Sequence, residues 1–320
     1  MRETRARPIR VLLILTAIAV GVIVLFMTLN ARGRWDFILP FRGMKVVSMV
    51  LAAYAVAVST VLFQTVGHNR ILTPAIMGFD SLYILLQTSL VFSLGSARLT
   101  ALDPRLLFGL EVVTMVLFAV LLYRWLFSGT SRSLHLLVLV GIVFGLLFRS
   151  LASFMQRIID PNEFSILQDR LFANFNSVES DLLLVSFGMV AVASLAAWQL
   201  VPVYDVLALG RDAAINLGLD YGRAVTTVLV LVAVLVSVST ALVGPVTFFG
   251  LLVANLAYQV AGTHKHRFIL PVAALLAVIC LVGGQLILER VFAFDTALSI
   301  VIEFLGGILF LVLLIRGIAR

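Results

Sequence analysis

The stretch from Phe63 to Asp80 reads FQTVGHNRILTPAIMGFD, and it separates two long apolar runs. Glycine and proline within it, at Gly67 and Pro74, are the residues that end helices and mark turns. If the apolar runs on either side are membrane spans, the chain turns here at the membrane boundary. Non-helical backbone at that depth is tolerated only where protein or a water-filled cavity surrounds it. The stretch therefore predicts a break beside a transport pathway or, as the alternative, a plain turn with Asn69 as a cap.

The composition indicates a membrane protein. Hydrophobic residues make up 62% of the 320 positions, charged residues 12%, and the mean hydropathy is +1.14. These values lie far outside what a soluble core needs. We predict an all-α, polytopic membrane protein that forms one transmembrane domain over residues 1–320. About ten apolar runs are long enough to cross a bilayer as helices, at residues 11–29, 46–65, 76–94, 106–127, 134–154, 181–201, 222–242, 245–261, 268–288 and 298–316.

The basic residues predict the orientation. The first ten residues, MRETRARPIR, carry four arginines before the first apolar run, and no small-residue cleavage site follows that run. We interpret the run as a retained helix, and the positive-inside rule places its start in the cytoplasm. Ten spans then put both termini on that side. The net charge of +7 is scattered over many loops and not gathered in one stripe, which argues against nucleic acid as a partner.

Few residues are suited to catalysis or to cofactor binding. The single Cys280 lies inside an apolar run, so it supports neither a disulfide framework nor a thiolate metal site. His264 and His266 fall in GTHKHR, which is typical of a turn between helices, with a two-histidine metal site as the alternative. Neither Lys45 nor Lys265 lies in a phosphate-binding loop. We therefore expect no cofactor and no enzymatic activity, with any ATP hydrolysis on a separate subunit.

Two segments are too polar to span the membrane but show an ordered pattern. Residues 155–180 form the predicted outer loop, in which Asp160 to Glu163 has the pattern of a helix start with proline at the first helical position. Residues 203–221 form the predicted cytoplasmic loop, with short helices interrupted at Gly210 and Gly218. The apolar face of this second loop indicates contact with a partner.

The sequence from Arg42 to Gly78, RGMKVVSMVLAAYAVAVSTVLFQTVGHNRILTPAIMG, resembles the iron-chelate and vitamin B12 permease family of bacterial ABC importers. The family pattern there is R-x-P-R, a small-residue helix and Q-x-x-x-R-N-P-L-A-x-P-x-x-L-G. LGRDAAINLGL, from Leu209 to Leu219, is similar to the family's L-G-x-x-A-x-x-L-G loop. The segment from Gly244 to Leu276 resembles the family motif that ends in H-R-x-x-L-P-x-x-A-L.

Some positions depart from the family pattern. HNRIL at residues 68–72 replaces R-N-P-L-A, ANLAY at 254–258 replaces P-H-x-x-R, and DTALS at 295–299 replaces E-L-P-x-G. The variant GHNRILTPAIMGFDSLY resembles the branch that imports ferric siderophores with two different permease chains.

The resemblance implies a fold, partners and a cargo. It implies a vitamin B12 permease-like bundle in the bacterial inner membrane, paired with a sister permease or with a second copy of itself. Two ATPase subunits are expected inside, and a periplasmic or lipoprotein substrate-binding protein outside. The implied cargo is a ferric siderophore, with catecholates among the candidates, and haem and cobalamin stay open as alternatives.

The resemblance also assigns candidate site residues. The ATPase-coupling candidates are Leu209, Gly210, Ala213, Leu217 and Gly218. The candidates for docking the binding protein are Arg42, Lys45 and Arg290, which are basic in the family and meet acidic residues of that protein. Polarity within or beside the apolar runs, and not the resemblance alone, gives the candidates for the pathway or the membrane interior, which are Gln64, Asn69 and Glu303.

Two other function classes were weighed against this interpretation. An ion-driven secondary transporter would use carboxylates inside the spans, for which Glu111 and Glu303 are the candidates, but no Asp/His relay accompanies them. A membrane enzyme would need Asp, His and Ser clustered at one depth, and the sequence shows no such cluster. Co-purification of an ATPase subunit would separate the importer from both alternatives.

Overall fold

The computed structural model describes residues 3–29, 33, 35–127, 134–175, 178–291 and 298–315, and every regular element within them is a helix. The all-α prediction is thus confirmed. The elements in chain order are α1 (Glu3–Thr28), α2 (Trp35–Gly67), the short 3₁₀-helix η1 (Pro74–Met77), α3 (Phe79–Leu94), α4 (Ser96–Ala101), α5 (Pro104–Phe127), α6 (Leu134–Gln156), α7 (Pro161–Leu171), α8 (Ser180–Gln199), α9 (Val201–Leu207), α10 (Arg211–Asn216), α11 (Tyr221–Val243), α12 (Phe249–Ala261), α13 (His266–Val291) and α14 (Leu298–Ile315).

The predicted spans correspond to ten of these helices. In the described part of the chain, α1, α2, α5, α6, α8, α11 and α13 are each long and apolar enough to cross a membrane. The shorter apolar helices α3 and α12, together with the apolar α14, complete the set. Several helices extend past the predicted bounds, and α2 begins at Trp35 where the apolar run begins at residue 46. Hydropathy marks the part of a helix that suits lipid, whereas the helix continues for as long as its backbone hydrogen bonds do.

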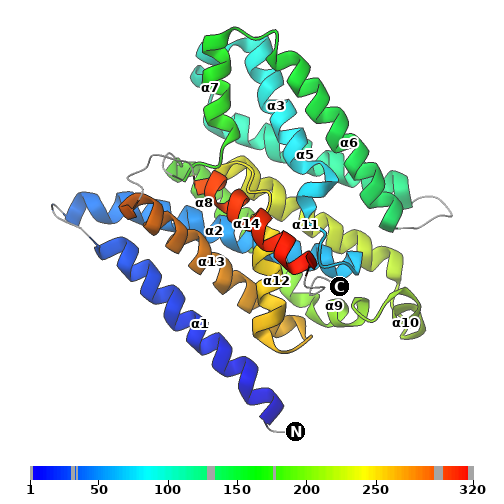
Figure 1. The fold of residues 1–320 in the computed structure, drawn as a ribbon. Helices are drawn as coiled ribbons and strands as arrows, with labels where there is room; N and C mark the ends of the chain where they lie inside the picture. The colour runs from blue at the N-terminus through cyan, green and yellow to red at the C-terminus, as the bar shows by residue number, and fades with distance from the viewer. Residues whose placement is uncertain are drawn as a thin grey trace.

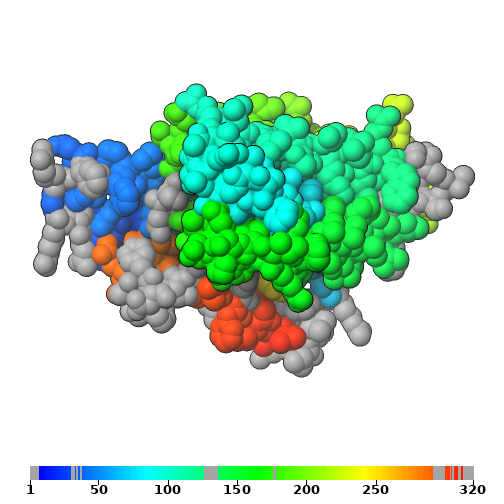
Figure 2. All heavy atoms as spheres, turned by 90° about the horizontal axis from the view of Figure 1, so that it is seen from above, coloured from blue at the N-terminus to red at the C-terminus, as the bar shows by residue number. Residues whose placement is uncertain are grey.

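The helices pack around α2 and α11, which are the most deeply buried of the long spans. α2 packs against α11 and α13, α13 packs against α1 and α12, and α11 also contacts α5 and α8 (Figure 1). α3, α6 and α7 form a second group on one side of this core. Figure 2 shows that group from above as a continuous mass of cyan and green residues, with the blue N-terminal helices at one edge.

The break at residues 68–78 lies directly on another helix. Gly78, which precedes α3, has a left-handed φ of +88°, and a Cβ atom there would lie 3.1 Å from the Cα atom of Gly145 in α6. A Cβ atom on Gly141 would lie 2.8 Å from the Cα atom of Met77. Contacts this short exclude a side chain. Glycine on both elements therefore lets η1 pack against the backbone of α6.

Protein side chains satisfy the exposed backbone of the same break. The carbonyl oxygen of Arg70 accepts hydrogen bonds from Nε2 of Gln64 at 2.7 Å and from Nδ2 of Asn255 at 3.1 Å. Oδ1 of Asn69 accepts the backbone N–H of Ile71 at 2.9 Å, which closes a local turn. The amides of α2 and α12 thus supply the partners that non-helical backbone requires at a membrane boundary.

The two polar segments contain the helices that their sequence patterns predicted. Asp160 caps α7 by accepting the N–H of Asn162 at 2.9 Å, and Pro161 is the first helical residue. α9 and α10 are separated at Gly210, with φ at +99°, and Gly218 follows α10 with φ at +84°. Side chains are strained at such φ values, so glycine sets both ends of α10.

Candidate functional site

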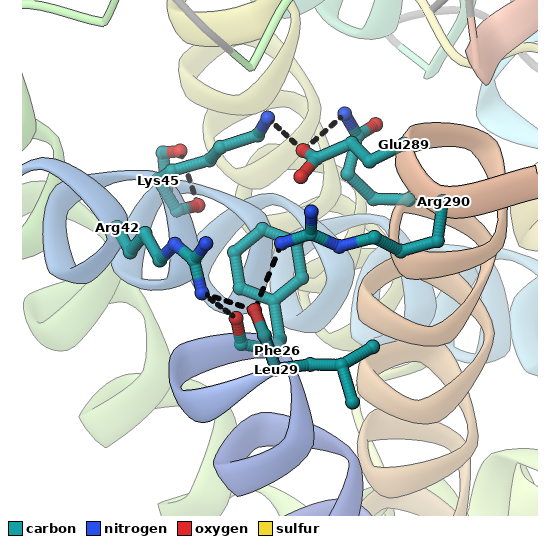
Figure 3. Close-up of polar contacts among 8 residues, drawn as sticks. Phe26, Leu29, Arg42, Lys45, Glu289 and Arg290 are labelled. Carbon is teal, nitrogen blue, oxygen red and sulfur yellow. Dashed lines mark hydrogen bonds and ion pairs between the residues drawn. The ribbon is translucent and has the colours of Figure 1, made fainter. Parts of the chain in front are cut away.

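Two of the predicted docking residues meet at the C-terminal end of α1. Nη1 of Arg42 donates to the carbonyl oxygens of Phe26 and Met27, each at 3.0 Å, and to that of Leu29 at 2.9 Å (Figure 3). Nη2 of Arg290 donates to the same Leu29 oxygen at 2.9 Å. The last carbonyls of a helix lack partners within it and carry its negative dipole end. Two arginines from α2 and α13 therefore cap α1.

Lys45, the third docking candidate, is buried beside them. Its ammonium group pairs with the Glu289 carboxylate of α13, and the two side chains are only 7% and 11% exposed. Nε2 of Gln285 donates to the same carboxylate oxygen at 3.0 Å. Such a pair is stable only when both charges stay together, because a single buried charge is costly. The structure thus brings Arg42, Lys45 and Arg290 together, with Lys45 inside the bundle.

The opposite end of α2 and α13 carries a second polar contact. Asp205 of α9 accepts hydrogen bonds at Oδ1 from both the backbone N–H and the ring Nδ1 of His266, at 2.9 and 2.7 Å. Nε2 of the same ring lies 2.7 Å from Oγ1 of Thr65, in the last turn of α2. The ring of Tyr204 meets the imidazole edge to face with centroids 5.8 Å apart. We refer to Thr65, Asp205 and His266 as the histidine joint.

A cavity of about 800 Å³ opens beside the histidine joint. The predicted pathway residues Gln64 and Asn69 both line it, together with His68, Arg70, Tyr258, His264 and Lys265. Asp205 is the sole carboxylate among the described residues that line it, against the cations Arg70 and Lys265, so the charged side chains of the lining are net positive. The Arg70 guanidinium lies over the Tyr258 ring at 4.6 Å. Partial burial lowers the pKa of His68, which favours its neutral form near pH 7.

The predicted coupling residues form an exposed apolar face. Leu209 and Leu217 are 63% and 64% exposed, whereas the neighbouring Ala214 is fully buried. Ala213 is half-buried on α10. The segment lies outside the long spans, at the end of α2 that holds the histidine joint (Figure 1). Covering these exposed leucines would remove apolar surface from water, which favours the binding of a partner.

The carboxylates considered for ion coupling are placed differently. Glu111 of α5 is buried and accepts a hydrogen bond at 2.8 Å from Nε2 of Gln87 in α3. This pair borders a separate cavity of about 410 Å³ between α3, α5 and α11. Glu303 belongs to α14, but its side chain lies outside the described residues. A single buried carboxylate paired with an amide does not form the relay that proton transport requires.

Comparison with known proteins places this arrangement in a family. The sequence profile of the FecCD transport family matches residues 9–316, nearly the whole chain. The chain belongs to the FecCD transport family. It is 47% identical over 303 residues to the petrobactin import system permease protein YclO of Bacillus subtilis (strain 168), covering 95% of this chain and 96% of YclO. It is 39% identical over 275 residues to the petrobactin permease FatC of Bacillus anthracis, covering 86% and 78% of the two chains.

A solved structure supports the fold. A metal-chelate type ABC transporter in an inward-facing conformation matches with a TM-score of 0.85 at 21% identity, covering 97% of this chain and 99% of the other. The similarity agrees with the permease bundle that the sequence implied. As a FecCD permease, the chain is a membrane component of an importer and is not the ATP-hydrolysing enzyme.

Sequence reasoning missed the partners of these FecCD residues. Gln285 and Glu289 stand four apart near the end of a predicted span, and that polar spacing on one helix face could have suggested a buried pair. Asp205 lies in a loop with several other polar residues, so nothing in the sequence singled it out as the partner of His266. Those two residues are 61 positions apart and meet only through the fold.

The buried pair predicts an asymmetric effect of substitution. Lys45→Met should lower the free energy of unfolding by about 3 to 5 kcal/mol, because it leaves the Glu289 charge buried without its cation. The double substitution Lys45→Met with Glu289→Met should restore most of that loss, because no charge is left to desolvate. Thermal unfolding of the purified chain in detergent measures both. Equal melting temperatures for the single and double variants would contradict the buried pair.

Proposed function

We propose that this FecCD permease moves a ferric siderophore inward across the bacterial inner membrane, with ferric petrobactin as the first candidate. The proposal rests on the 47% sequence identity to the petrobactin permease of Bacillus subtilis, which extends over 95% of this chain. The net positive lining of the cavity beside Gln64 and Asn69 suits such a cargo. Ferric catecholate complexes are anionic, because their oxygen ligands carry more negative charge than the ferric ion carries positive.

The chain acts with other subunits. Family membership implies ATPase subunits, a substrate-binding protein and a second permease chain. We assign two ATPase subunits to the side of α9 and α10 and the binding protein to the side of Arg42 and Arg290, with both termini in the cytoplasm. In transport, the bundle then alternates between two packed arrangements. ATP binding on the other subunits shifts the equilibrium between these two arrangements.

Uptake by cells tests the cargo. Deleting this chain from its host should abolish uptake of iron-55 supplied as ferric petrobactin, and a plasmid copy should restore it. Uptake of haem and of cobalamin should be unchanged in the same strains. Loss of either of those, with petrobactin uptake intact, would contradict the siderophore assignment. Uptake that continues without the ATPase subunit would instead favour ion-driven transport.

Docking of the binding protein rests on Arg42 and Arg290. Arg42 uses Nη1 for all three of its carbonyl contacts, which leaves the three N–H donors on Nε and Nη2 of its guanidinium group. Both arginines can therefore cap α1 and still donate to carboxylates of a docked protein. Because Lys45 is buried against Glu289, we assign it the role of positioning this end of α2 and leave the docking contacts to the arginines.

Charge reversal at the two arginines should weaken docking. Arg42→Glu with Arg290→Glu should slow association of the binding protein and remove most of its salt dependence, because rim charges act mainly on association rate. The matched control is Arg124→Glu, an exposed arginine in the last turn of α5 at the opposite end. Surface plasmon resonance at several salt concentrations measures the effect. Equal rates and equal salt dependence in the double variant would rule out docking through these residues.

The exposed leucines of the coupling segment should bind the ATPase subunit. Leu217→Glu should preserve the fold, because the side chain is 64% exposed, and should lower recovery of the ATPase in pull-downs. The matched control is Ile166→Glu on α7, an exposed residue at the other end of the bundle. The two variants should be compared at equal amounts of membrane-inserted chain. Normal ATPase recovery and normal uptake with Leu217→Glu would show that this segment is not the coupler.

A further inference from the structure

α2 and α13 form an antiparallel pair that is held by polar contacts at both ends. Thr65, near the end of α2, contacts His266 at the start of α13. Lys45, near the start of α2, pairs with Glu289 near the end of α13. The twenty residue steps from Lys45 to Thr65 extend about 30 Å along a helix, which matches the thickness of the hydrocarbon core. One contact therefore lies at each boundary of the membrane.

Close packing joins the two helices between these contacts. The packed helices carry fully or almost fully buried alanines, namely Ala52, Ala53, Ala55 and Ala57 of α2 and Ala273 and Ala277 of α13. Small residues let helix backbones approach closely in a membrane. A pair packed in this way, with fixed contacts at both ends, moves as one body more readily than two separately held helices do.

The contact at the coupling end is specific in its hydrogen bonding. The Asp205 carboxylate only accepts hydrogen bonds, so Nδ1 of His266 must carry a proton. The same carboxylate oxygen also accepts the first backbone N–H of α13, which no residue inside the helix can satisfy. The start of α13 is thereby fixed to α9, the helix that leads into the coupling segment. Displacing α9 must displace α13 or break both bonds.

The contact at the docking end reaches the proposed binding-protein surface. Glu289 is adjacent to Arg290, and Lys45 lies three residues after Arg42, within one helical turn. Both arginines also donate to the Leu29 carbonyl oxygen at the end of α1. A binding protein that pulls on either arginine therefore loads the same end of the α2 and α13 pair (Figure 3).

We propose that the α2 and α13 pair, closed by the Lys45–Glu289 ion pair and the histidine joint, transmits binding-protein docking to the ATPase-coupling segment. His266 and Lys45 are then positioning residues, because they act on this route by holding helices together. This inference rests on the proposed function, since it needs a docked protein at one end and an ATPase at the other. It adds the route between them, which family membership does not specify.

The test measures ATP hydrolysis by the assembled complex in lipid vesicles, with and without the binding protein that co-purifies with the wild type. His266→Leu removes both ring contacts at similar volume, and Arg267→Gln, at the exposed position next to it, is the control. We expect His266→Leu to reduce the stimulation of ATP hydrolysis between about twofold and thirtyfold. Hydrolysis without the binding protein and the affinity for the binding protein should stay at wild-type values, which a merely misfolded permease would not show.

Two further variants keep the test decisive if His266→Leu fails to assemble. Thr65→Val removes one hydroxyl at constant shape and should reduce stimulation in the same direction, by less. Lys45→Met with Glu289→Met opens the other end of the pair without leaving a buried charge. Because both ends lie on one route, the losses from Thr65→Val and from the neutral pair should not multiply when the variants are combined.

The outcomes separate the inference from the function on which it depends. Wild-type stimulation in both Thr65→Val and the neutral pair, at normal amounts of assembled complex, would overturn the route through α2 and α13. Losses that multiply in the combined variant would also overturn it, because they would show two independent routes. A wild-type chain that recovers no ATPase, or whose ATPase ignores the binding protein, would instead reject the proposed function.

Discussion

Each backbone N–H and C=O group that lies in or at the edge of a membrane must find a hydrogen-bond partner within the protein. Helices meet this requirement along their length but not at their ends. Polar side chains of the candidate sites supply the missing partners at three such ends. Arg42 and Arg290 cap the end of α1, Gln64 and Asn255 satisfy the break after α2, and Asp205 caps the start of α13.

This constraint explains why the candidate functional residues coincide with structural ones. Where a cap reaches across from another helix, it joins two elements. Arg290 of α13 joins α13 to α1, and Asp205 of α9 joins α9 to α13. Residues that close helix ends near a membrane surface are also the ones that a partner outside the membrane can reach. The residues proposed for transport are therefore also ones that close helix ends.

The fold was predictable because long apolar runs in the sequence mark most of its helices. Each of the ten apolar runs became a helix, and Gly210 and Gly218 separated the short helices where the sequence placed the interruptions. The opening stretch was predicted correctly as a break, in which Asn69 closes a local turn and Gln64 and Asn69 line a cavity. A pathway role for that cavity stays a prediction.

The partners within the site could not be predicted in the same way. Hydropathy and motif spacing describe one segment at a time, whereas Lys45 and Glu289 are 244 positions apart, and Thr65 and His266 are 201 apart. The family pattern indicated a basic residue at position 45 but not that it would be buried, because burial depends on α13 carrying a carboxylate one residue before Arg290. That local difference separates Lys45 from the two arginines with which the resemblance had grouped it.

A buried ion pair and a histidine joint suit a bundle that must change its packing. Replacing a buried ion pair by apolar residues is often neutral or stabilising, so its contribution to stability does not explain its position. What the pair imposes is geometry, because its charges tolerate separation poorly in a medium of low dielectric constant. Apolar side chains can slide past one another at little cost in free energy. The polar contacts at the two ends of the α2 and α13 pair break if these helices slide past each other. The polar contacts thus determine which helices move together, and the apolar surfaces allow the movement.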